Sequence, residues 1–338
     1  MCSTTWLEAT HNAEIIGFFL SLTLNFILLF LISEMPKKTF GSYKYLMFSF
    51  SVLGIYYSCC AFWSNPNVHI TEWSFIVFNV QKYTTLTKPI GTIAIGMYCS
   101  CYGMMLSLLT IHFYYRYLSV TCPSQLSRFS AKFVPIWAII VVTNSSVWFF
   151  TSYHLNGPSQ LKDLHVYPEF LKSYCLKPDD FAYASAQYFY EDHVSEGVKF
   201  HFLSLFATGV MAAIMVFTLS AIFYFGIQTY IHLYRLSSIA GLDNRELQNQ
   251  LFRTLVVQTV IPFFFMYFPV SCMILLPLFG IKVKEIGNIA PIFAAIYPCF
   301  EPLVAMFIIK NFRYRIIGLL TCNRFKKPVT VPVRPMPN

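Results

Sequence analysis

Seven apolar runs, each long enough to cross a lipid bilayer as a helix, alternate with polar segments along this chain. A helix needs roughly 20 apolar residues to span about 30 Å of hydrocarbon. At 56% hydrophobic and 12% charged, the chain carries about half the charge of an ordinary soluble domain. The sequence therefore predicts an all-α membrane protein, a seven-transmembrane helix bundle in one domain, residues 14–310. We expect the spans at residues 14–33, 45–63, 90–115, 133–153, 200–229, 254–279 and 288–309.

The basic residues indicate how this bundle is oriented. Two thirds of the 24 Lys and Arg residues lie in the first, third and fifth connecting segments and in the C-terminal tail. By the positive-inside rule these segments are cytoplasmic, so the N-terminus is expected outside. The first run begins at Glu14 without a basic leader or a cleavage site, which favours a retained helix after an extracellular tail, residues 1–13. The net charge of +9 then reflects membrane orientation, and no nucleic-acid partner is expected.

The ten cysteines do not suggest a disulfide framework. Only Cys2 and Cys175 are expected to face an oxidising compartment, and the sequence leaves open whether they are bonded or free. Six others lie inside apolar runs, where cysteine is usually a small hydrophobe: Cys59, Cys60, Cys99, Cys101, Cys272 and Cys299.

Polar and proline residues mark the later runs. Asp243 and Glu246 have the spacing of a capping box, which predicts that helix six starts in the cytosol, with a short surface helix as the alternative. Prolines lie within three spans, and each is expected to bend its helix because it removes a backbone hydrogen bond. Bends in spans six and seven would suit parts that move, and static kinks are the alternative. These prolines are Pro135, Pro262, Pro269, Pro277, Pro291, Pro298 and Pro302.

The chain changes character after the seventh run. Residues 311–322 place apolar side chains on one face and Arg313 and Arg315 toward the other, which predicts a short amphipathic eighth helix at the membrane surface. Cys322 at its end is a candidate for palmitoylation. Residues 323–338 are rich in proline and basic side chains, and they are predicted to form a disordered cytoplasmic tail.

No catalytic constellation occurs in the sequence, so the chain is predicted not to be an enzyme. The histidines lack paired metal-ligand spacing and no glycine-rich phosphate loop is present, so neither a metal nor a cofactor is expected. Glu191, Asp192 and His193 are consecutive, which fits a solvated acidic loop better than a metal site. Glu301 is the one ionisable residue that we place deep in a span, where such a group is functional by default.

The end of the third run carries a further signal, because Arg116 closes it in the segment HFYYRY, residues 112–117. An arginine there could simply extend to lipid phosphates. Together with the seven spans, the long sixth helix, the acidic proline motif of span seven and the interfacial helix, however, the chain resembles a G-protein-coupled receptor.

Several segments narrow this resemblance to the nematode chemoreceptors of serpentine receptor class r, the Str family. The resembling segments, in chain order, are residues 41–47, 98–101, 112–117, 250–262, 265–269, 297–302 and 309–313. One departure is Glu301, where the family leads us to expect an aspartate.

The resemblance implies that a small chemical cue binds in the outer half of the bundle, and that helices three, five, six and seven rearrange to activate a heterotrimeric G protein. Tyr98 and Tyr102 share one face of helix three, about 27 and 21 Å from Arg116 at about 1.5 Å per residue. Aromatic core packing is the alternative role for both. The candidate ligand-binding residues are Tyr98, Tyr102, His201, Ser204, Thr208, Met273 and Leu276. The residues assigned to coupling and switching are His112, Tyr115, Arg116, Tyr117, Leu251, Arg253, Tyr267, Pro269, Tyr297, Pro298, Glu301 and Pro302.

The same positions restrict the ligand. The outer half of helix three has no carboxylate to pair with an amine, and span seven has no central lysine to bind retinal. We therefore expect a neutral, largely apolar odorant-like ligand, read by shape and one or two hydroxyl hydrogen bonds. The acidic, tyrosine-rich segment 154–199 has no apolar period of its own and is a candidate lid.

Two other functional classes stay open at this point. One is a ligand-gated channel subunit of the insect odorant-receptor kind, which would place its N-terminus inside the cell. The other is a small-molecule transporter, which the missing sequence repeat disfavours. We expect a multi-pass protein of the plasma membrane in contact with lipids and, by resemblance, of the cilium of sensory neurons. Its trafficking partners and its dimerisation are not predicted.

Overall fold

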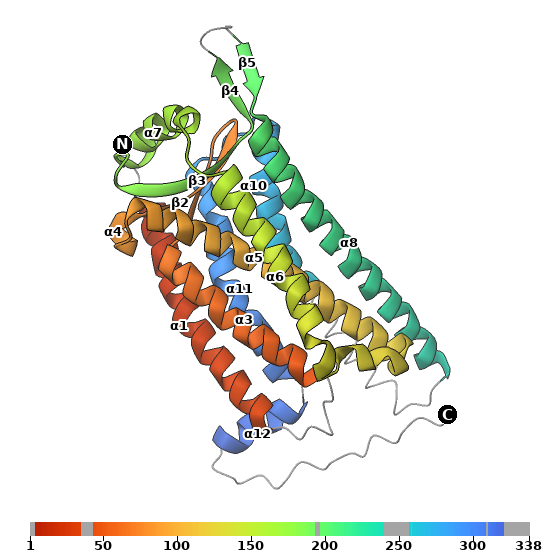
Figure 1. Cartoon of the computed structure of the whole chain (residues 1–338). Helices are drawn as coiled ribbons and strands as arrows, with labels where there is room; N and C mark the ends of the chain where they lie inside the picture. Colours follow the sequence, from red (N-terminus) through yellow and green to blue (C-terminus); the bar gives the residue numbers. More distant parts are fainter. Residues whose placement is uncertain are drawn as a thin grey trace.

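The computed structural model describes residues 4–34, 43–192, 197–239, 257, 259–308 and 310–320. Within these residues, seven helices are long and apolar enough to cross a membrane, and they form the single bundle seen in Figure 1. The predicted seven-helix fold is therefore confirmed. We number these helices as spans one to seven: Thr5–Glu34, Lys44–Ser64, Lys88–Thr121, Ala131–Leu155, Phe202–Arg235, Thr259–Leu278 and Glu285–Ile308.

The helices of the bundle are packed around span three. Its helix α5 packs against α3, α6 and α8, and carries buried side chains along its whole length. Helix α1 packs against α3 and α11. Small residues allow this close approach, since a Cβ at Gly17 of α1 would lie 2.6 Å from the Ala295 carbonyl oxygen of α11. The elements of the spans are α1 (Thr5–Glu34), α3 (Tyr43–Ser64), α5 (Lys88–Thr121), α6 (Val134–Phe150) with the π-helix η3 (Thr151–Leu155), α8 (Phe202–Ile239), the π-helix η4 (Phe263–Tyr267) with α10 (Phe268–Leu278), and the 3-10 turn η5 (Glu285–Asn288) with α11 (Ile289–Ile308).

Span one begins earlier than predicted, because residues 5–13 are helical and not an extended tail. Leu7 stabilises this extra length by packing into an apolar cluster formed by helix α7 (Gln160–Tyr174) and the sheet described below, and Glu8 in the first turn suits the positive end of the helix dipole. As a result Glu14 lies well inside α1 and is only 2% exposed. The prediction that Glu301 is the one ionisable residue deep in a span is therefore wrong.

One end of the bundle carries a small antiparallel β-sheet that the all-α prediction missed. Strands β1 (Asn67–Ile70), β2 (Ser74–Val80) and β3 (Phe181–Gln187) pair in that order. Every residue of the three strands is buried, so β2 and β3 show no regular alternation of polar and apolar residues, and the four alternating residues of β1 are too few to predict a strand. The other elements at this end are α4 (Gln81–Thr84), α7 (Gln160–Tyr174) and the hairpin β4 (Phe189–Asp192) with β5 (Gly197–Phe200).

Helix α12 (Lys310–Leu320) marks the opposite end of the bundle, where the amphipathic helix was predicted (Figure 1). We call the two ends the sheet end and the α12 end. Phe312 of α12 is fully buried in a cluster with residues of α1, α3 and α11, and Arg315 makes two hydrogen bonds to Glu34, of 2.8 and 2.9 Å. The 3-10 turns η1 (Pro123–Phe129) and η2 (Ala131–Phe133) connect spans three and four. The predicted capping box at Asp243 and Glu246, Cys322 and the tail 323–338 lie outside the described residues.

The prolines differ in what they do to their helices. Pro135 lies in the first turn of α6, where a helix needs no N–H donor, so the bend predicted there was wrong. Pro262 and Pro269 flank the π-turn η4 in span six. In α11, Pro302 has no N–H to offer the carbonyl of Pro298. Asn25 of α1 donates to that carbonyl instead, at 3.2 Å, and so ties spans one and seven together.

Candidate ligand cavity and coupling region

A cavity lies between the sheet and the bundle. It offers about 80 Å³ to the centre of a water-sized sphere, which at roughly 10–15 Å³ per water is room for about five to eight waters. Its wall is formed by spans two to seven and by strands β1, β2 and β3. Strand residues Val68, Phe75 and Val77 close it on the sheet side, so the sheet forms a roof over the cavity.

Most of the wall is apolar, and it includes three tyrosines. The Tyr102 hydroxyl donates to the Met266 carbonyl at 3.2 Å. The rings of Tyr57 and Tyr98 lie beside each other, with centroids 5.7 Å apart. A small apolar chamber with a few polar points is the usual form of a site for a small organic ligand.

Three of the predicted ligand-binding residues, Tyr98, Tyr102 and Met273, line this cavity. The structure does not bring the other four to its wall. Ser204 and Thr208 are buried within α8 and Leu276 packs partly buried against the main core. The sequence indicated only how deep these residues lie along their helices. Depth does not determine which face of a helix points into the cavity.

His201 also lies away from the cavity wall, where the hairpin meets α8. Its backbone N–H donates to the Tyr188 carbonyl at 2.8 Å, and its Nδ1 accepts from the backbone N–H of Ser204 at 3.2 Å. Burial and the nearby charge of Lys162 lower the pKa of His201 below its ordinary value. His201 therefore acts as the N-cap of α8.

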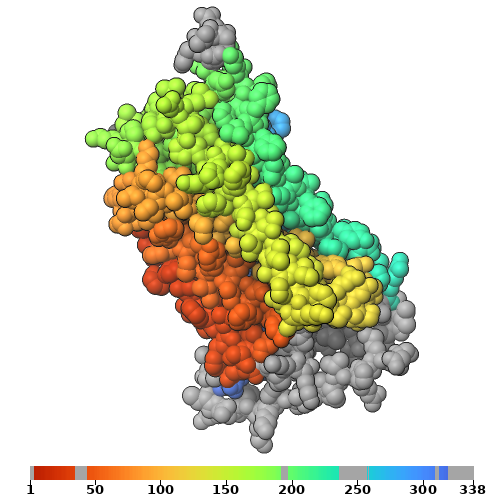
Figure 2. All heavy atoms as spheres, in the orientation of Figure 1, coloured from red at the N-terminus to blue at the C-terminus, as the bar shows by residue number. Residues whose placement is uncertain are grey.

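Span four and the residue that follows it contribute three wall residues that the sequence analysis missed, Trp148, Ser152 and Asn156. They follow one another at intervals of four, so they share one helix face. That spacing was visible in the sequence, but an apolar span gives no indication of which face it turns inward. Figure 2 shows span four in yellow-green along the front of the molecule, between the orange spans and the green α8.

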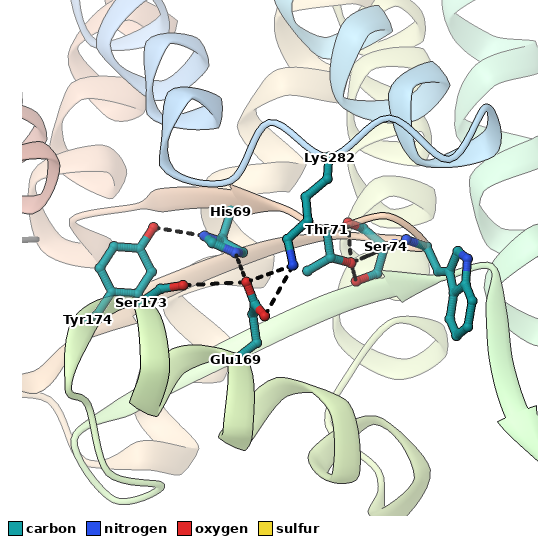
Figure 3. Close-up of polar contacts among 8 residues, drawn as sticks. His69, Thr71, Ser74, Glu169, Ser173, Tyr174 and Lys282 are labelled. Carbon is teal, nitrogen blue, oxygen red and sulfur yellow. Dashed lines mark hydrogen bonds and ion pairs between the residues drawn. The ribbon is translucent and has the colours of Figure 1, made fainter. Parts of the chain in front are cut away.

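Glu169 of α7 joins three connecting segments at the sheet end (Figure 3). Its Oε1 lies 3.3 Å from Nε2 of His69 on β1 and 3.2 Å from Nζ of Lys282, in the segment between α10 and η5. The other ring nitrogen of His69 lies 3.0 Å from the Tyr174 hydroxyl. The hydrogen bond from His69 is the main cause that lowers the pKa of Glu169 to about 2. Partial burial opposes this shift, and the Lys282 ammonium adds to it.

Further bonds hold the roof to the bundle. The Tyr188 hydroxyl donates to the Ile274 carbonyl of α10 at 3.2 Å, and Ile70 of β1 exchanges backbone hydrogen bonds with Lys284. Cys175 at the end of α7 is disulfide-bonded. Cys2, the partner considered from the sequence, lies outside the described residues. The six cysteines predicted to be small hydrophobes are free thiols.

At the α12 end, predicted switch residues of spans three and seven meet. Arg116 Nε donates to His112 Nε2 at 3.0 Å. Nδ1 of His112 lies 4.0 Å from Glu301 Oε1, with His112 almost fully buried. Tyr297, one turn before Glu301, is buried and lines with it a small recess between spans six and seven. Arg116, His112 and Glu301 thus follow one another between spans three and seven, joined by one hydrogen bond and one 4.0 Å approach.

The remaining coupling residues are distributed over two regions. Tyr115 packs edge-on against Phe129 with centroids 5.0 Å apart, and Tyr117 lies 5.4 Å from Phe225 of α8. Tyr267 of the π-turn donates to the Thr218 hydroxyl of α8 at 3.0 Å. Leu251 and Arg253 lie outside the described residues. No cluster of residues suited to a metal ion occurs in the described part of the chain.

The comparisons with known proteins agree with this architecture. The family described as serpentine type 7TM GPCR chemoreceptor Str matches residues 10–317. Serpentine receptor class r-10 of Caenorhabditis briggsae is 29% identical, covering 97% of this chain and 95% of the relative. Its namesake in Caenorhabditis elegans is also 29% identical, over 95% and 93%, and the C. elegans G-protein coupled receptor str-33 is 23% identical, over 90% and 88%. The chain therefore belongs to the Str family of serpentine seven-transmembrane chemoreceptors, which are multi-pass membrane receptors and not enzymes.

Proposed function

We propose that this chain is a chemosensory receptor that binds a small neutral molecule in the cavity under the sheet and activates a heterotrimeric G protein at the α12 end. Family membership supports a chemical ligand and a G protein as the two classes of partner. The distribution of Lys and Arg supports an orientation with the sheet end outside and the α12 end in the cytoplasm. By its family resemblance, we place the receptor in the plasma membrane of sensory cilia.

The observation that carries the proposal is the hydrogen bond from Tyr102 to the Met266 carbonyl. Tyr102 lines the cavity, and Met266 belongs to the π-turn η4 of span six. The next residue, Tyr267, donates to Thr218 of span five. A ligand that moves Tyr102 therefore changes the contacts of a π-turn, a helix irregularity that is frequent at functional sites.

The switch itself is assigned to Arg116, His112 and Glu301. In this structure Arg116 donates to His112 within span three, and the His112 ring lies 4.0 Å from Glu301 of span seven. A G protein shifts the receptor between two states only by binding one state better than the other. We propose that the active state releases this link and that Arg116 then helps to form the G-protein site.

Replacement of Arg116 tests this assignment. Arg116→Ala is expected to abolish ligand-driven G-protein activation while leaving the receptor at the cell surface. The matched control is Lys172→Ala, which removes an exposed basic side chain at the sheet end. Surface labelling and a calcium response in a heterologous cell are measured together. An unchanged response of Arg116→Ala would rule out the assignment.

The orientation of the chain separates this function from a channel subunit of the insect odorant-receptor kind. An epitope at the N-terminus is expected to be accessible to antibody in intact cells. An epitope that is reached only after permeabilisation would favour the channel.

A further inference from the structure

We propose that Lys162 of α7 makes closure of the roof depend on the external pH. Its charged form favours separation of β3 from the end of span four, and its neutral form favours the closed arrangement of this structure. This inference goes beyond the proposed function and assumes nothing about the ligand. It uses the proposed orientation only to identify the relevant pH as the external one.

Lys162, in the first turn of α7, is a buried cation. Its side chain is only 1% exposed. Its Nζ donates to the carbonyls of Leu155 and Gly157, at 3.3 and 3.0 Å, where span four ends. None of the ion pairs between described residues includes Lys162. A buried charge without an opposite charge beside it is costly, because two carbonyl groups replace only part of its hydration.

The same short segment joins span four to the roof. Strand β3 is at the edge of the sheet, and its Ser185 N–H donates outward to the Asn156 carbonyl at 2.8 Å. Three consecutive carbonyls, those of residues 155–157, therefore hold both Lys162 and the roof. Asn156 lines the cavity, as do the residues on both sides of Ser185. Separation at this point would open the cavity wall and admit water to the Lys162 ammonium.

The direction of the pH effect follows from the burial of Lys162. Burial lowers the pKa of Lys162 from 10.5 to about 8. An ammonium that is hydrated in the open arrangement has its ordinary pKa again. Between these two values the open arrangement binds more protons than the closed one, so a rising pH favours closure. With these pKa values, opening becomes about tenfold rarer from pH 7 to pH 9.

Other titratable groups surround Lys162. Burial and the charge of Lys162 lower the pKa of His201 below 6.5, so His201 is neutral in this pH range. Tyr183 of β3 donates to Asp163 of α7, and burial raises the pKa of Tyr183 well above its ordinary value. The remaining ionisable residues in the adjoining parts of η3, α7 and the hairpin are His154, His165, Tyr190, Glu191, Asp192 and Lys199. They are retained in every variant below, so a contribution from them would survive the replacement of Lys162.

Hydrogen exchange of the full-length receptor in detergent, at several pH values from 7 to 9, tests the proposal. The reporter is the Ser185 amide, because separation of β3 from span four breaks its bond to Asn156. Its protection, corrected for the intrinsic exchange rate at each pH, is expected to rise about tenfold over this range. The internal reference is the Ile70 amide, which donates to Lys284 at the opposite edge of the sheet and should not change.

Two substitutions and one control assign the effect to Lys162. Lys162→Gln keeps a hydrogen-bond donor without a charge, and Lys162→Arg keeps a charge that is not lost at any pH used. Both are expected to remove the pH dependence of protection at Ser185. Lys172→Ala, which removes an exposed lysine from the last turn of the same helix, should retain the rise of about tenfold. The thermal unfolding temperature of each variant reports whether it folds.

Three results would overturn the proposal: constant or falling protection at Ser185 in the unmodified receptor, an equal rise at Ile70, or a rise that survives in either Lys162 variant. The first two need no variant, so they apply even where a substitution prevents folding. Failure of the proposed function is measured separately, as G-protein activation in the Arg116→Ala experiment. A receptor that shows the expected exchange but never activates a G protein would support the present inference and refute the proposed function.

Discussion

The two ends of the molecule are held together by different kinds of interaction. At the sheet end, backbone hydrogen bonds join segments far apart in the chain: β2 to β3, β1 to Lys284, and Ser185 to Asn156. At the α12 end, the contacts described between spans three, four and five are mainly ring packing, as with Tyr114, Trp137 and Phe225. Backbone bonds are directional, and ring contacts tolerate sliding. The comparison predicts that the sheet end, with the cavity below it, is the more rigid of the two ends.

The largest expected effect comes from replacing Gly103, which lies between the two ends. Gly103→Ala places a methyl group against Trp148, so we expect a loss of about 1–3 kcal/mol in stability from overpacking, together with loss of ligand stabilisation. Gly209→Ala is the matched control, because a Cβ there meets nothing within 4 Å. It should be neutral or stabilising by up to about 1 kcal/mol. Thermal unfolding of both variants is the measurement, and equal effects would show that the cavity wall is more adaptable than the comparison implies.

A second test concerns the tie between spans one and seven. Asn25→Leu removes the donor to the Pro298 carbonyl and leaves that buried oxygen unsatisfied, at a cost of about 1–3 kcal/mol. Because this tie lies away from the cavity wall, G-protein activation should change while the ligand preference stays the same. Thr23→Val serves as control, since Thr23 is exposed and bonds only within its own helix. Altered ligand preference in Asn25→Leu would contradict the separation of the two ends.

The smallest expected effect is an acid sensitivity confined to the sheet end. The pKa of Glu169 is lowered from 4.5 to about 2, so its contribution to stability is fully present above about pH 4.5 and is lost as the pH falls toward 2. Hydrogen exchange at decreasing pH should show the β1 and α7 amides losing protection before those of α8. Glu169→Gln should remove this pH dependence, at a cost of about 1 kcal/mol, whereas Glu72→Gln in the exposed turn after β1 should not. Simultaneous loss of protection at both ends would argue against their independence.

The sequence predicted the membrane spans, which depend on composition. It did not predict the sheet or the inward-facing side of each helix, which depend on tertiary packing. Seven apolar runs are sufficient to locate seven spans, whereas the sequence assigned Arg116, His112 and Glu301 to the switch without predicting that His112 lies between the other two. The sheet was missed because all its residues are buried, which removes the alternation that identifies a strand. Ser204 and Thr208 were placed at the cavity, and Trp148 and Asn156 were not, because the rotation of an apolar helix depends on its neighbours. Gly103 leaves room for Trp148 of span four, and this role becomes visible only when the indole beside it is known.

The roof formed by β1, β2 and β3 has a consequence for timing. For a ligand bound at the proposed site, we expect affinity to depend on the cavity wall and escape toward the sheet end to require strand hydrogen bonds to open. Duration of a response and sensitivity to its cue are therefore separately adjustable: changes in the strands alter how long a signal persists after the cue is withdrawn, and changes in the wall alter how little of it is detected.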